Sequence, residues 1–385
     1  MSYTVSFFVH NLGGNPLGRA LPIAKALRRC GHKVEILGFT FGRNEIYKPY
    51  REEVDAKTIT TTKKPVEFYR KARKLAQQAE GDIIYAFKPL VSTLAPALYA
   101  ARVVQSRPLL LDVEDEEVYL DRVSDWQDVW IKILRGWRLV TSWKYTRLLQ
   151  LFRRAVDAVT VVSTPLQERY GGTILRHGPD EHQFDPNRFG QPHQLREKWE
   201  LPTDRKLAFF IGTPRSHKGL NKLAQAIRKC QSWDLVLVGP KENEFSRAAK
   251  GHLGDRFHKL GMRPYHLAPE FLSMADAVPI PQLETSFGEA QVPAKLLDAM
   301  AMARPIIASS IGDLADILGN GRRGWLVPPG NQKALAESLR FVEEYPKKAE
   351  QRGKRARRWY EKNASTRAIG NKLNRVIHQA LQQFE

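Results

Sequence analysis

A glycine-rich turn near the amino terminus has the composition of a phosphate-binding loop. Gly13 and Gly14 follow a short apolar run, residues 4–9, and precede a helical pattern from Arg19 to Cys30. At such a junction, free backbone amides and the positive end of the helix dipole can hold a phosphate. The glycine spacing matches neither GxGxxG nor a Walker A loop, which disfavours an NAD or P-loop site. A turn used only for packing is the alternative.

A second loop of this kind, residues 212–219, carries two cations. Arg215 and Lys218 lie between a predicted strand, Leu207–Ile211, and a predicted helix over 220–230. Two positive side chains here could neutralise a diphosphate leaving group, Arg215 by bidentate contact and Lys218 as a movable point charge. Exposed Arg and Lys are common in loops, so a solvated surface pair is the alternative.

The most informative stretch runs from Glu284 to Ala308. It contains PxKxxxxMAxxRPIIAS, in which Asp298 stands three residues after Lys295. This pattern resembles the donor-site motif of family 4 glycosyltransferases. The segment Gly324–Asn331 resembles the strand and helix cap that follow in the same family.

The other segments fall in the family's order: Gly13-Gly14 with Arg19, residues 175–186, Lys218-Gly219 and residues 275–277. The resemblance therefore spans roughly the whole chain and is strongest over 205–345. It implies a GT-B fold, that is, an α/β architecture of two Rossmann-like, doubly wound domains that face a cleft, with a C-terminal helix crossing back to the first domain.

The resemblance also implies an activity: retaining transfer of a sugar from a UDP- or GDP-linked donor to an acceptor. No metal or other cofactor is expected, because no DxD-like pair stands in a suitable loop apart from the run from Asp112 to Asp115. At matching positions, Asp298 would accept hydrogen bonds from the nucleotide ribose, since a carboxylate offers two acceptors to a diol. Lys218 and Arg215 would stabilise the departing phosphate. The donor would also contact the backbone at four positions: Gly13, Gly14, Ala294 and Lys295.

Three positions depart from the family pattern. The family's arginine directly follows a glycine, where this chain has Thr213, so the role of Arg215 needs a shifted loop. The family's first acid should stand eight residues before Asp298, where this chain has Ala290, so Glu289 is the candidate for that role. Many members have a histidine near the sugar after the fourth strand of the first domain. Here Glu114 or Asp115 occupies that place, and Glu114 is the candidate. The alternative for these acids is a solvated helix start that the helix dipole stabilises.

Short apolar runs alternate with helical patterns throughout the chain, which indicates parallel sheets covered by helices. In the first half, strands are predicted over residues 4–9, 33–38, 82–86, 108–112 and 158–162, with helices over 19–30, 64–79 and 90–104. In the second half, strands are predicted over residues 207–211, 234–238, 256–260, 277–280, 305–308 and 324–327. The predicted domains are residues 1–187 with a helix over about 364–385, which would bind the acceptor, and 188–363, which would bind the donor.

A basic, tryptophan-rich segment spans residues 129–156. Trp130, Trp137 and Trp143 alternate with cations such as Arg138, and the segment contains no acid. Such a helix suits the surface of an anionic membrane. An ordinary helical pair with core tryptophans and solvated arginines is the alternative.

The composition limits the class of protein. The chain has 385 residues, 61 Lys and Arg against 41 Asp and Glu, and a net charge of +20, which favours anionic partners. Nucleic acid is disfavoured because no recognition motif accompanies the charge. Cys30 and Cys230 cannot form a disulfide framework or a zinc cluster, and no apolar run reaches the ~18 residues of a spanning helix. We therefore expect a cytoplasmic protein, peripheral to the inner face of a membrane.

The acceptor is predicted to be a glycan or a lipid-linked precursor of a cell-surface glycan. Two other functions stay open: a sugar-nucleotide epimerase on the same scaffold, and a catalytically silent protein that binds lipid or a partner. His177, in the interdomain loop, could point toward a ligand, but a histidine satisfied within its own turn is the alternative.

Overall fold

The computed structural model describes residues 2–42, 45–115, 155–240 and 242–384. The chain forms two compact units: Met1–His177 with Thr366–Glu385, and Gly178–Ser365. The sequence pattern places the boundary between 187 and 188, whereas residues 178–187 belong to the second unit. There, Gly178 N donates to Ala364 O (2.9 Å) and the Tyr360 hydroxyl to Pro179 O (2.6 Å).

The first unit is built on a seven-stranded parallel sheet with the order β3-β2-β1-β4-β5-β6-β7. Its strands are β1 (Thr4–Val9), β2 (Lys33–Phe41), β3 (Lys57–Thr61), β4 (Ile83–Phe87), β5 (Leu109–Val113), β6 (Ala158–Val161) and β7 (Thr173–Ile174). Its helices are α1 (Leu17–Arg29), α2 (Pro65–Ala76), α3 (Val91–Tyr99), α7 (Thr164–Tyr170) and α17 (Thr366–Phe384), with short helical turns at η1 (Lys48–Tyr50) and η2 (Ala100–Val104).

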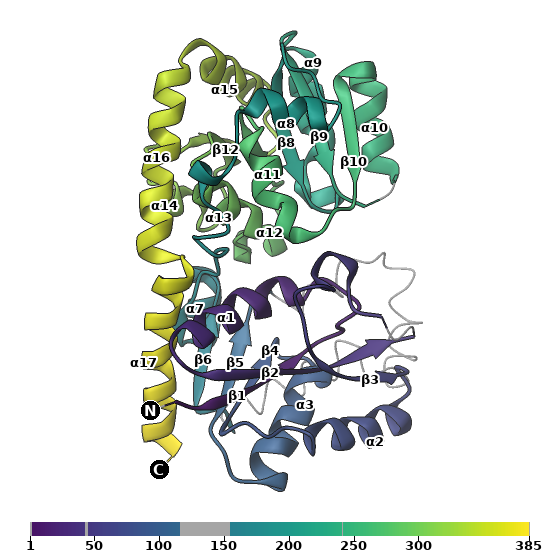
Figure 1. Ribbon diagram of the computed structural model, residues 1–385, viewed down its shortest axis with the longest axis vertical. Coiled ribbons are helices and arrows are strands. Elements are labelled where there is room, and N and C mark those ends of the chain that lie inside the picture. The colour runs from purple at the N-terminus through teal and green to yellow at the C-terminus, as the bar shows by residue number, and fades with distance from the viewer. Residues whose placement is uncertain (1, 43–44, 116–154, 241, 385) are drawn as a thin grey trace. The chain divides into compact units, whose positions relative to one another are not determined.

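The strand order reverses direction at β1, because β2 and β3 lie on one side of it and β4 to β7 on the other. Right-handed crossovers in opposite directions put α1 on one face of the sheet and α2 with α3 on the other, as Figure 1 shows. Helix α17 packs beside α1 and β6, so the chain returns to the first unit at its end. The expected C-terminal helix is confirmed. A Cβ at Gly370 would lie 2.6 Å from Cys30 Sγ, which shows how closely α17 approaches α1.

The predicted strands all form, within one to three residues, but β3 and β7 were not expected from the sequence. Strand β3, KTITT, lies at the edge of the sheet and has only one buried residue, Thr61. Its mostly polar sequence lacks the apolar run of a central strand, although its β-branched residues favour a strand. Strand β7 has only two residues, which is too short for a sequence pattern.

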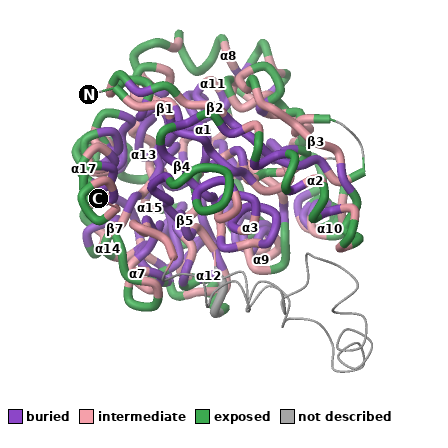
Figure 2. Tube along the Cα trace, turned by 90° about the horizontal axis from the view of Figure 1, so that it is seen from below, coloured by how far each residue is buried: buried purple, intermediate pink, exposed green. Residues whose placement is uncertain are grey.

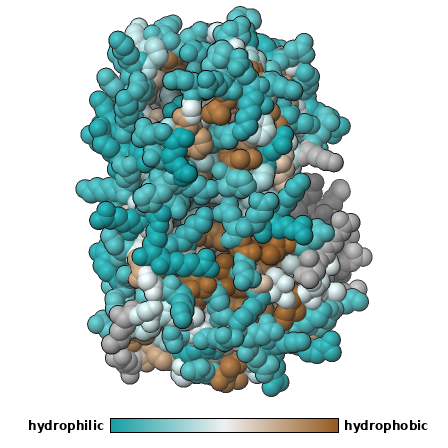
Figure 3. Space-filling view, in the orientation of Figure 1, coloured by the Kyte–Doolittle hydropathy of each residue, from teal (hydrophilic) through white to brown (hydrophobic). Residues whose placement is uncertain are grey.

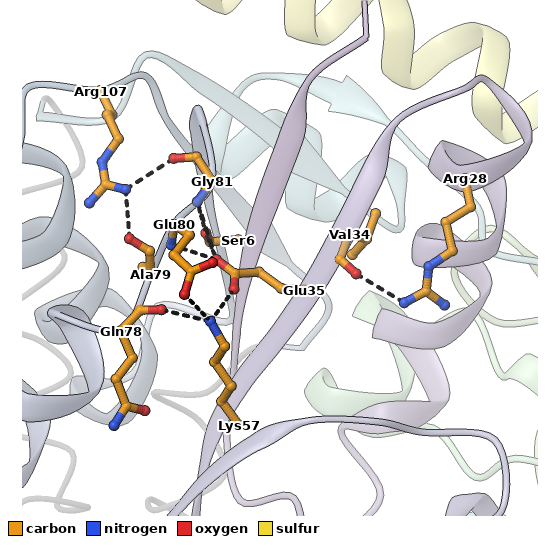
Figure 4. A network of polar contacts seen from close by, with 10 residues as sticks. All are labelled: Ser6, Arg28, Val34, Glu35, Lys57, Gln78, Ala79, Glu80, Gly81 and Arg107. Atoms are coloured by element: carbon orange, nitrogen blue, oxygen red, sulfur yellow. Dashed lines mark hydrogen bonds and ion pairs between the residues drawn. The ribbon is translucent and has the colours of Figure 1, made fainter.

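A polar network ties together the amino-terminal part of the first sheet (Figure 4). The Glu35 carboxylate accepts hydrogen bonds from Ser6 Oγ, from Lys57 Nζ (2.8 Å) and from the backbone N–H of Glu80 (2.7 Å). Burial opposes ionisation, but these hydrogen bonds lower the pKa of Glu35. Gly81 lies so close to this network that a side chain would not fit, because a Cβ there would lie 2.5 Å from Ser6 Oγ. The network links β1, β2 and β3 and stabilises the sheet.

The second unit has two three-stranded parallel sheets, β10-β9-β8 and β11-β12-β13. A parallel bridge between Ala208 and Ala277 joins them along β8 and β11. The strands are β8 (Lys206–Ile211), β9 (Trp233–Val238), β10 (Phe257–Gly261), β11 (Val278–Ile280), β12 (Ile306–Ser309) and β13 (Trp325–Val327). The longer helices are α9 (Leu220–Arg228), α10 (Glu244–Leu253), α13 (Ala294–Ala301), α15 (Gln332–Glu344) and α16 (Pro346–Asn363). Shorter helices and turns are η5 (Pro186–Arg188), α8 (Pro192–Lys198), η6 (Ser216–Lys218), η7 (Gly254–Arg256), η8 (Tyr265–Leu267), α11 (Ala268–Ser273), α12 (Ser286–Ala290) and α14 (Leu314–Ile317).

Each unit buries its strands between helices. Figure 2 shows the buried residues gathered in the strands and the exposed ones on outer helices. In the second unit, Trp233, Phe210 and Leu237 are fully buried in a core that α9 and α15 cover. Hydrophilic side chains cover most of the face seen in Figure 3, as the charge of the chain predicts.

Candidate active site

The second unit has a topological switch point between β8 and β11, where the order of its strands reverses direction. In open α/β sheets, ligands bind outside the carboxyl ends of strands at such a point. Lys218 lies there, at the end of η6 in the loop that follows β8. The backbone N–H of Leu283 donates to His217 O (2.8 Å), which fixes this loop against the segment after β11. The structure thus places Lys218 where a ligand is expected.

Gly219 allows the Lys218 loop to approach β11. Its φ is +65°, and a Cβ there would lie 1.9 Å from Pro281 O. Both the left-handed backbone and the contact with a carbonyl exclude a side chain.

We expect Gly219→Ala to displace Lys218 and to reduce nucleotide affinity by tenfold or more. Isothermal titration calorimetry with UDP and GDP measures this loss. Gly251→Ala is the matched control, because a Cβ at Gly251 would contact nothing within 4 Å. Equal affinities of the two variants would contradict the positioning role of Gly219.

Helix α13 brings two of the predicted donor residues to the same edge. Lys295 is half-buried overall, but its Nζ is fully buried and lies 3.6 Å from the centre of the Phe210 ring. Burial, and then the charge of Lys218, holds the pKa of Lys295 well below its usual value. Lys218 and Lys295 therefore act on each other electrostatically at the switch point.

Asp298 lies one turn further along α13 and is buried. Its Oδ1 accepts a hydrogen bond from the Tyr265 hydroxyl (2.8 Å). Burial raises the pKa of Asp298 to about 7, although the bond from Tyr265 opposes the rise. The sequence did not point to Tyr265, which comes from η8 and packs in a tilted arrangement against Phe184 at a centroid distance of 5.5 Å.

The other predicted donor residues lie on the surface or in turns. Arg215 and Glu289 are exposed, and Ala294 is exposed at the start of α13. Gly14 N donates to Asn11 O (2.9 Å), so this amide is already used within its own turn. At Gly13 and Gly14, a Cβ would meet its nearest neighbours at 3.1 and 3.3 Å, so neither position demands glycine as strictly as Gly219 does.

The first unit has its own switch point, between β1 and β4. His10 follows β1, and its Nδ1 lies 2.5 Å from Ser92 Oγ. Burial, with the charges of Lys88 and Lys63, lowers the pKa of His10 to about 3, so its imidazole is neutral at physiological pH.

Lys88 follows β4 with φ at +74°, a left-handed backbone that is unusual for a long side chain. Two hydrogen bonds hold it there: Lys88 N donates to Asp112 O (2.8 Å), and Thr93 Oγ1 to Lys88 O (2.6 Å). Backbone strain of this kind costs about 1 to 3 kcal/mol and concentrates at functional sites. Neither Lys88 nor His10 could be identified from the sequence, because only the strand order brings them together.

Glu114 follows β5 beside this switch point. Lys88 Nζ lies 2.5 Å from Asp115 Oδ2 and 3.7 Å from Glu114 Oε2. Burial raises the pKa of Glu114 to about 7, while the charge of Lys88 opposes the rise and that of Asp115 adds to it. Glu114 therefore has a carboxyl that can both donate and accept a proton near neutral pH.

A buried ion pair lies beneath this edge of the first sheet. Arg19 binds both carboxylate oxygens of Asp112, each at 2.6 Å, and neither side chain is exposed. Arg19 also lies 2.7 Å from His177 Nδ1, and Thr160 Oγ1 donates to Asp112 Oδ1 (2.5 Å). Burial and then Arg19 hold the pKa of His177 well below its usual value. His177 is thus held by a buried side chain from α1, and not within its own turn as the alternative drawn from the sequence had it.

Part of the predicted site lies outside the described residues: Trp130, Trp137, Trp143 and Arg138. No helix of the described part of the chain combines the length and the apolar character that crossing a membrane requires. Within residues 2–42, 45–115, 155–240 and 242–384, no cluster of three or more His, Cys, Asp or Glu side chains could hold a metal ion.

Comparison with known proteins identifies the second unit. A family model described as glycosyl transferases group 1 matches residues 193–359. Residues 193–359 therefore match the group 1 glycosyl transferases. The resemblance inferred from residues 284–308 is therefore confirmed at the level of this family. The matched range contains Lys218, Lys295 and Asp298.

The curated relatives that the chain matches are named as glycosyltransferases. Over 198 residues, 28% are identical to a putative teichuronic acid biosynthesis glycosyltransferase, TuaC of Bacillus subtilis, with 49% of this chain and 48% of that protein covered. Over 231 residues, 26% are identical to the D-rhamnosyltransferase WbpZ of Pseudomonas aeruginosa, covering 56% and 58%. The chain spans about half the length of the curated relatives it matches.

Solved structures match the chain over nearly its full length. Anabaena HepE, solved in complex with UDP and glucose, superposes with a TM-score of 0.74 at 16% identity, covering 97% of this chain and 99% of HepE. A glycosyltransferase from Rickettsia africae superposes with a TM-score of 0.72 at 18% identity, covering 99% of each chain. These likenesses confirm the GT-B fold expected from the sequence.

Proposed function

We propose that the chain is a retaining glycosyltransferase that moves a sugar from a nucleoside diphosphate to a glycan or lipid-linked acceptor. The observation that carries the proposal is the electrostatic proximity of Lys218 to Lys295 beside the switch point, with Asp298 one turn along the same helix as Lys295. The relatives named for teichuronic acid biosynthesis and rhamnosyl transfer support a sugar donor and a glycan product. The UDP complex of HepE supports a uridine donor over a guanosine donor.

Donor cleavage in this proposal is mainly electrostatic. The departing diphosphate gains negative charge as the bond to the sugar breaks, and Lys218 with Arg215 stabilises that charge. Glu289 remains the proposed first acid. The backbone at Gly13, Gly14 and Ala294 is proposed to contact the donor, for which the Gly14 amide would exchange its bond to Asn11 O (2.9 Å) for one to the donor. No metal is proposed to take part, which addition of EDTA to the assay tests.

The acceptor is proposed to bind the first unit at its switch point. His10 and Ser92 offer neutral hydrogen-bonding groups there, and Glu114 can exchange a proton near neutral pH. Glu114 is therefore the proposed group beside the transferred sugar. Contact with an anionic membrane through Trp130, Trp137, Trp143 and Arg138 is a further part of the proposal, as is a cytoplasmic location.

Donor turnover tests the function. The purified protein is incubated with UDP- and GDP-linked sugars, with and without a lipid-linked or glycan acceptor, and release of nucleotide is measured. Release that depends on the acceptor supports a transferase. Isomerisation of the donor without an acceptor would establish the epimerase, and binding of nucleotide without turnover would establish the silent protein.

Asp298→Asn tests the ribose contact. Because a carboxylate accepts hydrogen bonds from a diol better than an amide does, we expect the variant to lose tenfold or more in nucleotide affinity.

The titration of Asp298 also predicts that Asp298→Asn changes the stability of the protein in a pH-dependent way. The folded-state pKa of about 7 exceeds the ordinary value of 3.8, so ionisation opposes folding as pH rises between these values.

The variant should therefore equal the native protein in stability at pH 4 and exceed it at pH 8, by at most roughly 4 kcal/mol. Thermal unfolding at both pH values, without nucleotide, measures the difference. An equal difference in stability between the two proteins at pH 4 and at pH 8 would show that the pKa of Asp298 is not raised in the folded protein. Unchanged nucleotide affinity would remove the ribose contact from the proposal.

A further inference from the structure

The Lys295 ammonium group occupies an unusual environment. Its nitrogen is fully buried, and no acceptor among the described residues lies within hydrogen-bond distance of it. The nearest partner is the Phe210 ring, whose face attracts a cation but offers no lone pair. A buried charge without a hydrogen-bonding partner is costly, so this site favours either loss of the proton or arrival of an anion.

The surroundings of Lys295 point to an anion. It stands at the second position of α13, an eight-residue helix, and therefore lies at the positive end of the helix dipole. Lys218 adds a second positive charge from η6. One buried hydroxyl, Ser309 Oγ at the end of β12, also lacks a partner among the described residues and can donate a hydrogen bond to an anion. Because β12 pairs in parallel with β11, Ser309 lies at the edge of the sheet where the switch point is.

We propose that the Lys295 side chain itself binds the phosphate groups of the nucleotide donor, as a partner of Lys218, and takes up a proton from solvent when the phosphate arrives. This inference rests on the proposed function. It adds a side-chain role to a residue for which the family resemblance implies only a backbone contact.

The proton balance follows from the charges around Lys295. In the free protein, burial and Lys218 favour the neutral amine. A bound diphosphate brings two or more negative charges, which favour the ammonium form, so one proton moves from solvent to Nζ. Binding coupled to proton uptake weakens as pH rises, by up to tenfold per pH unit for one proton.

Other charged groups around α13 do not replace Lys218 in this role. Asp298, on the same helix, is hydrogen-bonded to Tyr265. From α16, Arg357 donates to Ala301 O at the opposite end of α13. From α11, Glu270 is paired with Lys198 (2.7 Å). Because Asp298 also titrates near neutral pH, the contribution of Lys295 must be isolated with variants of Lys295 itself.

Isothermal titration calorimetry with UDP and GDP tests the inference. Measurements at pH 7.5 and 8.5, in two buffers of different ionisation enthalpy, give the affinity and the number of protons taken up. At these pH values, the terminal phosphate of the nucleotide is already ionised and releases or takes up few protons itself. The native protein is expected to take up a fraction of a proton, up to one, per bound nucleotide, and to bind more weakly at pH 8.5.

Two variants separate the charge from the proton. Lys295→Met preserves apolar contact with Phe210 but should lose tenfold or more in affinity and lose the proton uptake. Lys295→Arg keeps a permanent charge, so it should retain affinity within a few-fold but bind without proton uptake. Lys229→Met, at an exposed lysine of the same unit, is the matched control and should behave as the native protein.

Native affinity in Lys295→Met, or unchanged proton uptake in both Lys295 variants, would overturn the inference while leaving the proposed function intact. Failure of the native protein to bind either nucleotide would instead remove the donor proposal. Thermal unfolding of each variant separates loss of binding from loss of fold. If Lys295→Met does not fold, the proton uptake of Lys295→Arg relative to the native protein still decides the question.

Discussion

Replacement of Asp112 by alanine is expected to lower the free energy of unfolding of the first unit by about 3 to 5 kcal/mol. Asp112 neutralises Arg19 through two hydrogen bonds of 2.6 Å, and both side chains are fully buried. Removing the carboxylate leaves a guanidinium without its counter-charge in the core. Water cannot compensate, because the Arg19 side chain has no exposed surface.

Differential scanning calorimetry measures this change. Nucleotide added to the sample should raise the transition of the second unit, which distinguishes it from that of the first. The double variant Arg19→Met with Asp112→Leu should recover much of the lost stability, because well-packed apolar residues often replace a buried ion pair at little cost. Glu67→Ala, which removes a partly exposed ion pair with Lys71 on α2, is the control and should change the free energy of unfolding only slightly. An equally small effect of Asp112→Ala would mean that the pair is not needed for folding.

Lys218→Ala is expected to reduce turnover of the donor by roughly 10²- to 10³-fold, the loss typical when one group that stabilises a developing charge is removed. Lys218 stands in the loop that Gly219 and Leu283 hold against the end of β11. Its position depends on backbone contacts, so removal of the side chain should leave the fold in place.

Steady-state kinetics under saturating donor give the turnover number, and thermal unfolding gives the stability of the same sample. Lys229→Ala removes an exposed cation from α9's C-terminal turn and should change neither quantity. A Lys218→Ala protein that unfolds would make Lys218 structural, and Lys218→Gln then tests the charge with less loss of packing. Full turnover in either variant would remove Lys218 from the mechanism.

The sequence predicts the fold well because its information is local. Apolar runs such as residues 4–9 and 207–211 mark buried parallel strands, and the pattern from Pro293 to Ser309 specifies a helix followed by a strand. The family motif also located Lys295 and Asp298 on one helix. Edge strand β3 was not predicted because most of its residues are partly exposed to solvent and its polar sequence has no apolar run.

The partners of the site residues could not be predicted, because they come from distant parts of the chain. Tyr265 reaches Asp298 across 33 positions, and Arg19 reaches His177 across 158. The sequence placed Asp112 at the end of a predicted strand with no role of its own, whereas the structure buries it with Arg19 and leaves Glu114 and Asp115 beside Lys88. The left-handed backbone of Lys88 has no signature in sequence at all.

Helix α17 has a consequence for the order in which the chain can fold during synthesis. The first unit needs Thr366–Glu385, but Gly178–Ser365 is made before these residues. At about 5 to 20 residues per second, the ribosome takes roughly 10 to 40 s to make that intervening part. Throughout this interval α17 has not been made, so the surface of α1 near Cys30, against which Gly370 later packs, is not yet covered by it. The second unit, which is continuous in sequence, can therefore complete its folding first, although its synthesis begins later.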